Sequence, residues 1–170
     1  MSKGKVWKYG DDVNTDVIFP GRYTYQIMPP EEMARHALED LDPEFAAGVR
    51  PLDVVVAGKN FGCGSSREQA AACLKAAGVQ AVIARSFARI YFRNAINLGL
   101  AVLQCDEAVE ALEKNDEIEI DLVRGEIRSS KGTFKFLPLP ESVISILEAG
   151  GLLESTKRKL GSVTQPTRSP

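Results

Sequence analysis

The chain has 170 residues, 44% of them hydrophobic and 26% charged, which is an ordinary composition for a globular domain. Its 21 basic residues nearly balance its 23 acidic ones, for a formal charge of −2, so no overall field attracts nucleic acid or an anionic membrane. The N-terminal segment turns acidic where a signal peptide needs an apolar run, and no stretch approaches the roughly 20 apolar residues that span a bilayer, so we expect a cytoplasmic protein.

Short apolar runs that alternate with helical periods predict an α/β domain. In chain order, strands are expected at residues 6–9, 52–57, 79–84, 100–103, 117–122, 126–128 and 133–137. Helices are expected after Pro30 and at residues 65–76, 86–97, 106–114 and 141–148. The order strand, helix, strand, helix, strand in the middle of the chain predicts parallel neighbours with right-handed crossovers. We expect residues 1–154 to form one domain and the polar, basic residues 155–170 to form a disordered tail.

Residues 10–28 form a long irregular segment that is dense in Asp, Asn, Thr and Tyr. Loops of this length inside compact domains are usually functional or disordered. The apolar residues Val17, Ile18 and Phe19 argue against disorder. We therefore predict that this segment faces a ligand.

The segment GKNFGCGSSREQ, residues 58–69, leaves a buried strand through glycines and enters a helix at Ser65 and Ser66. A helix start offers unpaired N–H groups and a partial positive charge, which suit an anion. Arg67 adds a guanidinium that can grip a carboxylate through two parallel hydrogen bonds. The pattern predicts an anionic substrate, with two hydroxyl groups placed to transfer protons or orient oxygens.

Two other interpretations of this segment remain open. Ser65 and Glu68 match a capping box, which needs no ligand, although a capping box gives no reason for Gly62, Gly64 or Arg67. A glycine-rich turn can also cradle a phosphate, but the Walker and dinucleotide patterns are both missing. A stand-alone module that binds small anions or nucleotides therefore stays as an alternative of a different class.

Other reactive groups give little sign of a site. The chain has three unevenly spaced cysteines, Cys63, Cys73 and Cys105. Three thiolates could hold an iron–sulfur cluster, but the short Cys-x-x-Cys spacing is missing, so no metal site is expected. One histidine, His36, cannot build a zinc site or a hydrolytic triad alone. Arg89 and Arg93 lie one turn apart and are expected to face solvent or a partner.

Three segments resemble, in order and in spacing, those of 3-isopropylmalate dehydratase small subunits: GDDVNTDVIFPGRYT, GKNFGCGSSREQA and SFARIYFRNAINLGL. The resemblance covers roughly residues 5–153. It implies the swivelling β/β/α domain of the aconitase type, a mixed sheet with parallel core strands and flanking helices. It also implies a large-subunit partner that carries a [4Fe–4S] cluster, with no cofactor on this chain.

The implied activity is that of a hydro-lyase in leucine biosynthesis, which isomerises 2- and 3-isopropylmalate by dehydration and rehydration and is inactive without the large subunit. By motif position, Ser65 resembles the base that moves the carbon-bound proton, Ser66 its helper and Arg67 the carboxylate clamp. A serine hydroxyl is a very weak acid, so a Ser65 alkoxide needs N–H groups and positive charge close by. The turn that ends at Gly64 is suited to supply them.

In this family the loop after Gly21 reads the variable arm of the hydroxy-acid substrate, which places Arg22, Tyr23, Thr24 and Tyr25 at the substrate. Homoaconitase-like members carry an arginine at the position of Tyr25, so the resemblance implies a neutral arm such as isopropyl. The segment departs from the usual Leu and Val, which leaves methylmalate- or dimethylmalate-type substrates open. Arg22 keeps homoaconitate or citrate open as well.

Overall fold

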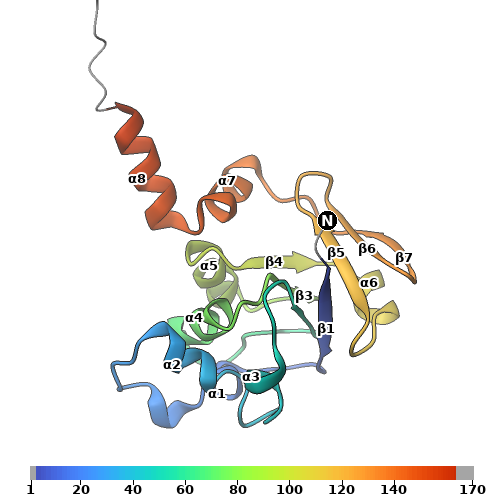
Figure 1. Ribbon diagram of the computed structural model, residues 1–170, viewed down its shortest axis with the longest axis horizontal. Helices are drawn as coiled ribbons and strands as arrows, with labels where there is room; N and C mark the ends of the chain where they lie inside the picture. Colours follow the sequence, from blue (N-terminus) through green and yellow to red (C-terminus); the bar gives the residue numbers. More distant parts are fainter. Residues whose placement is uncertain (1–2, 164–170) are drawn as a thin grey trace, which may run out of the picture.

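The computed structural model describes residues 3–163, whose strands form a seven-stranded sheet in the order β4-β3-β2-β1-β5-β6-β7 (Figure 1). The parallel half consists of β1 (Gly4–Lys8), β2 (Val54–Val56), β3 (Ala81–Ala84) and β4 (Ala101–Gln104). The antiparallel half consists of β5 (Glu117–Asp121), β6 (Glu126–Ser129) and β7 (Gly132–Lys135), and β5 joins it to β1. The predicted mixed sheet with parallel core strands is therefore confirmed.

The parallel strands form the centre of the core. Every residue of β2 and β3 is buried, as expected for strands covered on both faces. The crossovers between β2, β3 and β4 are the helices α4 (Glu68–Ala76) and α5 (Arg89–Asn97), which pack against each other. The helix α6 (Asp106–Ala111) follows β4 and packs against β3.

The segment between β1 and β2 folds into short helices beside α4. They are α1 (Thr15–Ile18), the 3₁₀ helix η1 (Gly21–Tyr23), α2 (Pro30–Arg35) and α3 (Phe45–Gly48). Both α1 and α2 pack against α4 (Figure 1). Ile18 and Phe19 are buried, which accounts for the order of this segment.

Two predicted helix starts are wrong. The helix expected from Ser65 begins at Glu68, with Arg67 at its N-cap, and the helix expected from Ser86 begins at Arg89. Ser86 does not cap a helix, because its hydroxyl accepts a hydrogen bond from the backbone N–H of Asn60 at 2.8 Å. The strand and helix bounds elsewhere differ from expectation by a few residues.

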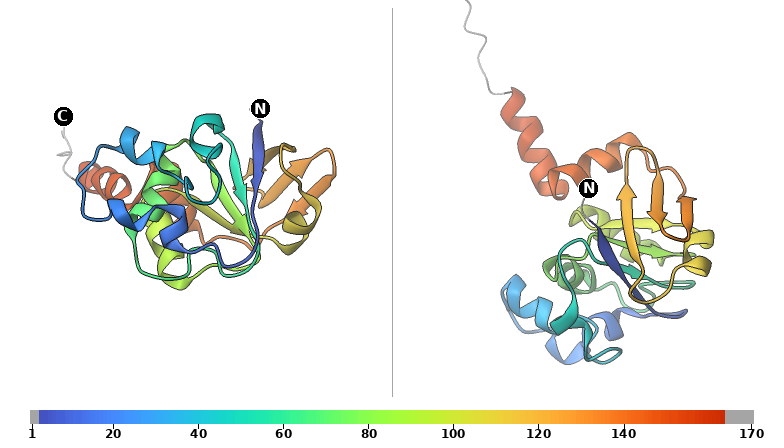
Figure 2. Two further views of the ribbon diagram at one scale, coloured as in Figure 1. Left: turned by 90° about the horizontal axis from the view of Figure 1, so that it is seen from below. Right: turned by 45° about the vertical axis from the view of Figure 1, so that its right-hand side comes forward.

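The C-terminal part of the chain differs from the expected disordered tail. After α7 (Glu141–Ala149), the helix α8 (Leu152–Val163) begins beyond Gly150 and Gly151 and extends away from the sheet (Figures 1 and 2). Residues 155–163 of the predicted tail belong to this helix, and the rest of the predicted tail, 164–170, lies outside the described residues. Within the described range, no helix is long and apolar enough to cross a membrane.

Candidate functional site

The turn between β2 and α4 is joined by hydrogen bonds to the start of α1. The backbone N–H of Thr15 donates to the carbonyl of Cys63 at 2.8 Å, and that of Gly62 donates to the carbonyl of Val13 at 2.8 Å. Asn14 and Cys63 form an isolated parallel bridge. Two motifs that lie about 50 residues apart in the sequence therefore make one structural unit.

Two glycines shape this turn through their backbone angles. Gly62 has a φ of +79° and Gly64 a φ of +95°, a region that favours glycine. A Cβ at Gly62 would lie 2.1 Å from Cγ of Tyr91, whereas a Cβ at Gly64 would meet nothing closer than 3.5 Å. Gly62 therefore lets α5 approach the turn, and Gly64 carries the chain to Ser65.

Ser65 is exposed, and its hydroxyl has two polar neighbours. Arg67 donates from Nε to Oγ of Ser65 at 3.0 Å, and Oγ1 of Thr15 lies 3.3 Å from the same atom. Thr15 also donates to the backbone carbonyl of Ser65 at 2.8 Å. The Ser65 hydroxyl is thus held next to a cation at the surface.

Arg67 is itself held in place. Its Nη2 lies 2.6 Å from a carboxylate oxygen of Asp16, and its Nη1 is buried without a hydrogen-bond partner in the described part of the chain. A Cβ at Gly21 would lie 3.1 Å from Nη1, so the start of η1 borders the guanidinium. Asp16 therefore fixes the orientation in which Nε faces Ser65.

The predicted capping box is wrong. Arg67, at the N-cap of α4, makes no side-chain cap hydrogen bond, and the Ser65 hydroxyl bonds to Arg67 and Thr15 rather than to the helix backbone. The hydroxyl of Ser65 is therefore not needed to start α4. This removes the simplest structural explanation for a serine at this position.

The serines border a cavity of about 200 Å³. Its walls come from α1, from the turn and from the start of α5, and the lining residues are Thr15, Gly62, Gly64, Ser65, Ser66, Arg67, Ala88, Arg89, Ile90, Tyr91 and Asn94. Pockets that enclose a small ligand usually measure about 300–1,000 Å³. In the isolated chain the cavity is therefore smaller than this usual range. Gly64, Ser65 and Ser66 are exposed at its edge.

Sequence reasoning missed Thr15 and Asp16 as individual site residues, and it expected Arg89 to face solvent or a partner. Arg89 is exposed but also lines the cavity. The only signal for Thr15 and Asp16 was the dense polar composition of residues 10–28. Nothing in that composition identifies the two side chains that contact Ser65 and Arg67.

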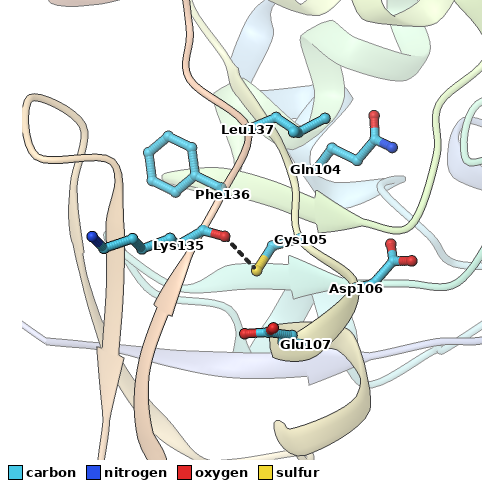
Figure 3. A pocket seen from close by; sticks show the side chains of 7 residues that line it. All are labelled: Gln104, Cys105, Asp106, Glu107, Lys135, Phe136 and Leu137. Carbon is cyan, nitrogen blue, oxygen red and sulfur yellow. Dashed lines mark hydrogen bonds between the residues drawn. The ribbon is translucent and has the colours of Figure 1, made fainter.

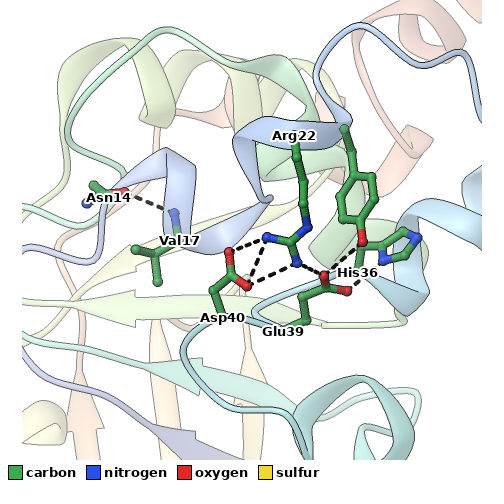
Figure 4. A network of polar contacts seen from close by, with 7 residues as sticks. Asn14, Val17, Arg22, His36, Glu39 and Asp40 are labelled. Atoms are coloured by element: carbon green, nitrogen blue, oxygen red, sulfur yellow. Dashed lines mark hydrogen bonds and ion pairs between the residues drawn. The ribbon is translucent and has the colours of Figure 1, made fainter.

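Arg22 and Tyr23 belong to a separate polar network (Figure 4). Arg22 donates to Asp40 at 3.0 Å and also to Glu39. The Tyr23 hydroxyl donates to Glu39 at 3.0 Å, and the Tyr23 ring stacks on His36 with centroids 4.0 Å apart. Partial burial raises the pKa of the Glu39 carboxyl, but hydrogen bonds from His36 and Tyr23 outweigh it and lower that pKa. Arg22 is therefore already paired.

The remaining predicted substrate residues of this loop, Thr24 and Tyr25, differ in exposure, and Thr24 is half-buried. The Thr24 carbonyl accepts a hydrogen bond from Gln69 of α4 at 3.3 Å, which ties the loop to the helix. The side chains of Tyr25 and Ile27 are almost completely exposed, at 98% and 104%. No residue of the predicted set Arg22 to Tyr25 lines the cavity beside Ser65. The structure thus brings Ser65, Ser66 and Arg67 together but leaves Tyr25 outside the cavity.

In residues 3–163 there is no group of three or more His, Cys, Asp or Glu side chains that could hold a metal ion. The three cysteines are free thiols, and burial, together with the Asp12 carboxylate, raises the pKa of Cys63. A larger cavity of about 340 Å³ lies between the ends of β4 and β7 (Figure 3). There Cys105 donates to the Lys135 carbonyl at 3.4 Å, and no lining residue is shared with the serine site.

Residues 32–108 match the model of a protein family described as the aconitase C-terminal domain. A crystal structure of 3-isopropylmalate dehydratase from Methanocaldococcus jannaschii superposes with a TM-score of 0.88 at 44% identity, covering 96% of this chain and 98% of that one. The expected aconitase-type fold is therefore confirmed.

The sequence relatives define the family more narrowly. The chain is 54% identical over 160 residues to a 3-isopropylmalate dehydratase small subunit of Caldicellulosiruptor bescii, covering 93% of this chain and 96% of the relative. It is also 54% identical over 156 residues to small subunit 1 of the same enzyme from Archaeoglobus fulgidus, covering 91% of this chain and 96% of the relative. The chain belongs to the family of 3-isopropylmalate dehydratase small subunits, as its motifs indicated.

Proposed function

We propose that the chain is the small subunit of a cytoplasmic hydro-lyase that interconverts 2- and 3-isopropylmalate by dehydration and rehydration in leucine biosynthesis. The observation that carries the proposal is the exposed Ser65 hydroxyl, which receives a hydrogen bond from the Arg67 guanidinium at the edge of a small cavity. The close relationship to small subunits of this enzyme gives the reaction and the substrate.

Ser65 is the base that moves the carbon-bound proton of the substrate. Because Nε of Arg67 lies 3.0 Å from Oγ of Ser65, its positive charge favours the deprotonated hydroxyl. The same guanidinium offsets the charge that develops on a substrate carboxylate when the neighbouring carbon loses its proton. Ser66 and Gly64, both exposed beside Ser65, orient the substrate oxygens in this proposal.

The site is completed by a large subunit. In the isolated chain the cavity measures only about 200 Å³, and Ile90 in its wall is 54% exposed. Tyr25 and Ile27, on the loop after η1, are exposed at 98% and 104%. Exposed apolar surface around a polar site is typical of an interface. A stand-alone anion-binding module would instead present a deep pocket within one chain. These features support a two-subunit enzyme.

In this proposal the large subunit carries the [4Fe–4S] cluster, as the relationship to the aconitase-type family implies. When bound, such a cluster supplies a Lewis acid for the substrate hydroxyl. The residues of this chain hold the carboxylate and move the proton.

The loop formed by residues 22–25 reads the variable arm of the substrate, with Tyr25 facing it. Arg22 is paired with Glu39 and Asp40, so its charge is not free for an extra carboxylate. This pairing favours a neutral arm such as isopropyl over the acidic arm of homoaconitate or citrate. The substrate-reading residues become enclosed only when the large subunit covers them.

The test uses the chain purified with its large subunit and compares Ser65→Ala with Ser130→Ala, a serine on the distant β6–β7 turn. We expect Ser65→Ala to lower kcat by about 100-fold or more, with a much smaller change in KM, because a base acts in the transition state. Ser130→Ala should behave as wild type. Wild-type turnover in Ser65→Ala, or dehydratase activity in the isolated chain, would contradict the proposal.

A further inference from the structure

Thr15 is buried beside Ser65 and is held there by backbone hydrogen bonds. Its side chain is 1% exposed, and its backbone N–H donates to the carbonyl of Cys63 at 2.8 Å. It is the first residue of α1, which Asn14 caps by accepting a hydrogen bond from the N–H of Val17 at 2.9 Å. The position of the Thr15 hydroxyl is therefore fixed by backbone bonds on both sides.

The hydroxyl of Thr15 can reach two oxygens of Ser65. Its Oγ1 lies 2.8 Å from the backbone carbonyl oxygen and 3.3 Å from Oγ of the side chain. A hydroxyl has a single hydrogen, which it can give to one acceptor at a time. Since Arg67 Nε can only donate to Oγ of Ser65, the hydrogen of neutral Ser65 can point to Oγ1 of Thr15.

This arrangement changes when Ser65 is deprotonated. Oγ of Ser65 then has no hydrogen to give, and it becomes a stronger acceptor than the carbonyl. The Thr15 O–H bond can turn from the carbonyl to Oγ by rotation about one side-chain bond. The deprotonated oxygen would then receive hydrogen bonds from both Arg67 Nε and Thr15 Oγ1.

We propose that Thr15 is a positioning residue that stabilises deprotonated Ser65 by turning its hydroxyl hydrogen from the Ser65 carbonyl to Oγ. The inference rests on the proposed function. The proton of Ser65 first leaves to solvent. Oγ then takes the proton from the substrate carbon, and the electron pair left behind forms the carbon–carbon double bond as the carbon–oxygen bond breaks. The hydroxide that leaves takes a proton from solvent and becomes water.

The burial of Thr15 makes this donor effective. A donor fixed in a dry environment stabilises a developing charge more strongly than water does, because it needs no reorganisation. The charged groups around Ser65 include Asp16, Arg67 and also Arg89, which lines the same cavity. The pairing of Asp16 with Arg67 at 2.6 Å leaves Nε of Arg67 directed at Oγ of Ser65. Thr15 is the second fixed donor.

The experiment compares Thr15→Val and Thr15→Ser in the chain assembled with its large subunit. Valine keeps the shape without the hydroxyl, and serine keeps the hydroxyl. We expect Thr15→Val to lower kcat about 10- to 100-fold with KM within roughly twofold, and Thr15→Ser to stay close to wild type. The rise of kcat with pH should move to higher pH in Thr15→Val, because the base becomes harder to deprotonate.

If Thr15 had only a structural role, holding the Ser65 carbonyl, Thr15→Val would lower the melting temperature and leave the pH profile of kcat unchanged. An unshifted profile in Thr15→Val, or a Thr15→Ser variant as impaired as Thr15→Val, overturns the inference. If Thr15→Val does not assemble, Thr15→Ala provides the same comparison. When Ser65→Ala is fully active, the proposed function fails; when only the Thr15 results disagree, this inference alone fails.

Discussion

A methyl group at Gly62 has no space in this fold. The alanine Cβ would lie 2.1 Å from Cγ and 2.4 Å from Cβ of Tyr91, atoms near the root of a buried side chain that cannot swing away. Alanine at a φ of +79° costs about 1–2 kcal/mol. Overpacking adds about 1–3 kcal/mol, so Gly62→Ala should lower the free energy of unfolding by roughly 2–5 kcal/mol.

The control for this prediction is Gly125→Ala. Gly125 has a similar φ of +71°, but a Cβ there meets nothing within 4 Å, so only the backbone cost of about 1–2 kcal/mol remains. Urea denaturation of both variants measures the difference. In a double-mutant cycle, Gly62→Ala combined with Tyr91→Gly should lose less stability than the sum of the two single changes, because glycine at position 91 removes both the Cβ and the Cγ that the new methyl would meet. Equal destabilisation of the two glycine variants, with no coupling to Tyr91, would refute the close-approach argument.

Two further outcomes are expected. Tyr25→Arg should raise kcat/KM for a substrate with an extra carboxylate relative to kcat/KM for isopropylmalate, because the new cation can pair with that carboxylate. The control variant Arg22→Ala should leave this ratio near the wild-type value. An unchanged ratio in Tyr25→Arg would show that Tyr25 does not contact the substrate. Burial raises the pKa of the Cys73 thiol above its ordinary value of 9.0, so the unfolded chain loses that proton first as pH rises. The free energy of unfolding should therefore fall above about pH 9, and it should fall less steeply with pH in the Cys73→Ala variant. Denaturation at a series of pH values measures both slopes, and identical slopes would contradict this prediction.

The strands were predictable because parallel strands buried on both faces appear as continuous apolar runs. Residues 54–56 and 81–84 are of this kind, and both are strands. Ser65, Ser66 and Arg67 were also brought together as expected, because they are adjacent in one turn. The contacts between residues far apart in the sequence were not predicted. Thr15, fifty positions from Ser65, lies within hydrogen-bond distance of the Ser65 hydroxyl, which therefore does not cap the helix.

Long-range pairing also explains the position of Arg22. The direction of Arg22 is set by Glu39 and Asp40, which lie 17 and 18 positions later and form no local pattern with it.

The polar sequence of the helix α8 predicted disorder. Its Glu, Lys and Arg residues are good helix formers, and the buried Ser155 bonds its N–H to the carbonyl of Gly151 at 3.0 Å.

The network of Figure 4 has a consequence for how substrate range can change within this family. Arg22, in the segment after Gly21, is held by the carboxylates of Glu39 and Asp40. Ser65 is held by Thr15 and Arg67 instead. The two networks share no hydrogen-bonded residue. In the proposed function residues 22–25 read the variable arm of the substrate. Grafting residues 22–27 from a relative with another substrate should therefore transfer substrate preference and leave the contacts of Ser65 with Thr15 and Arg67 unchanged.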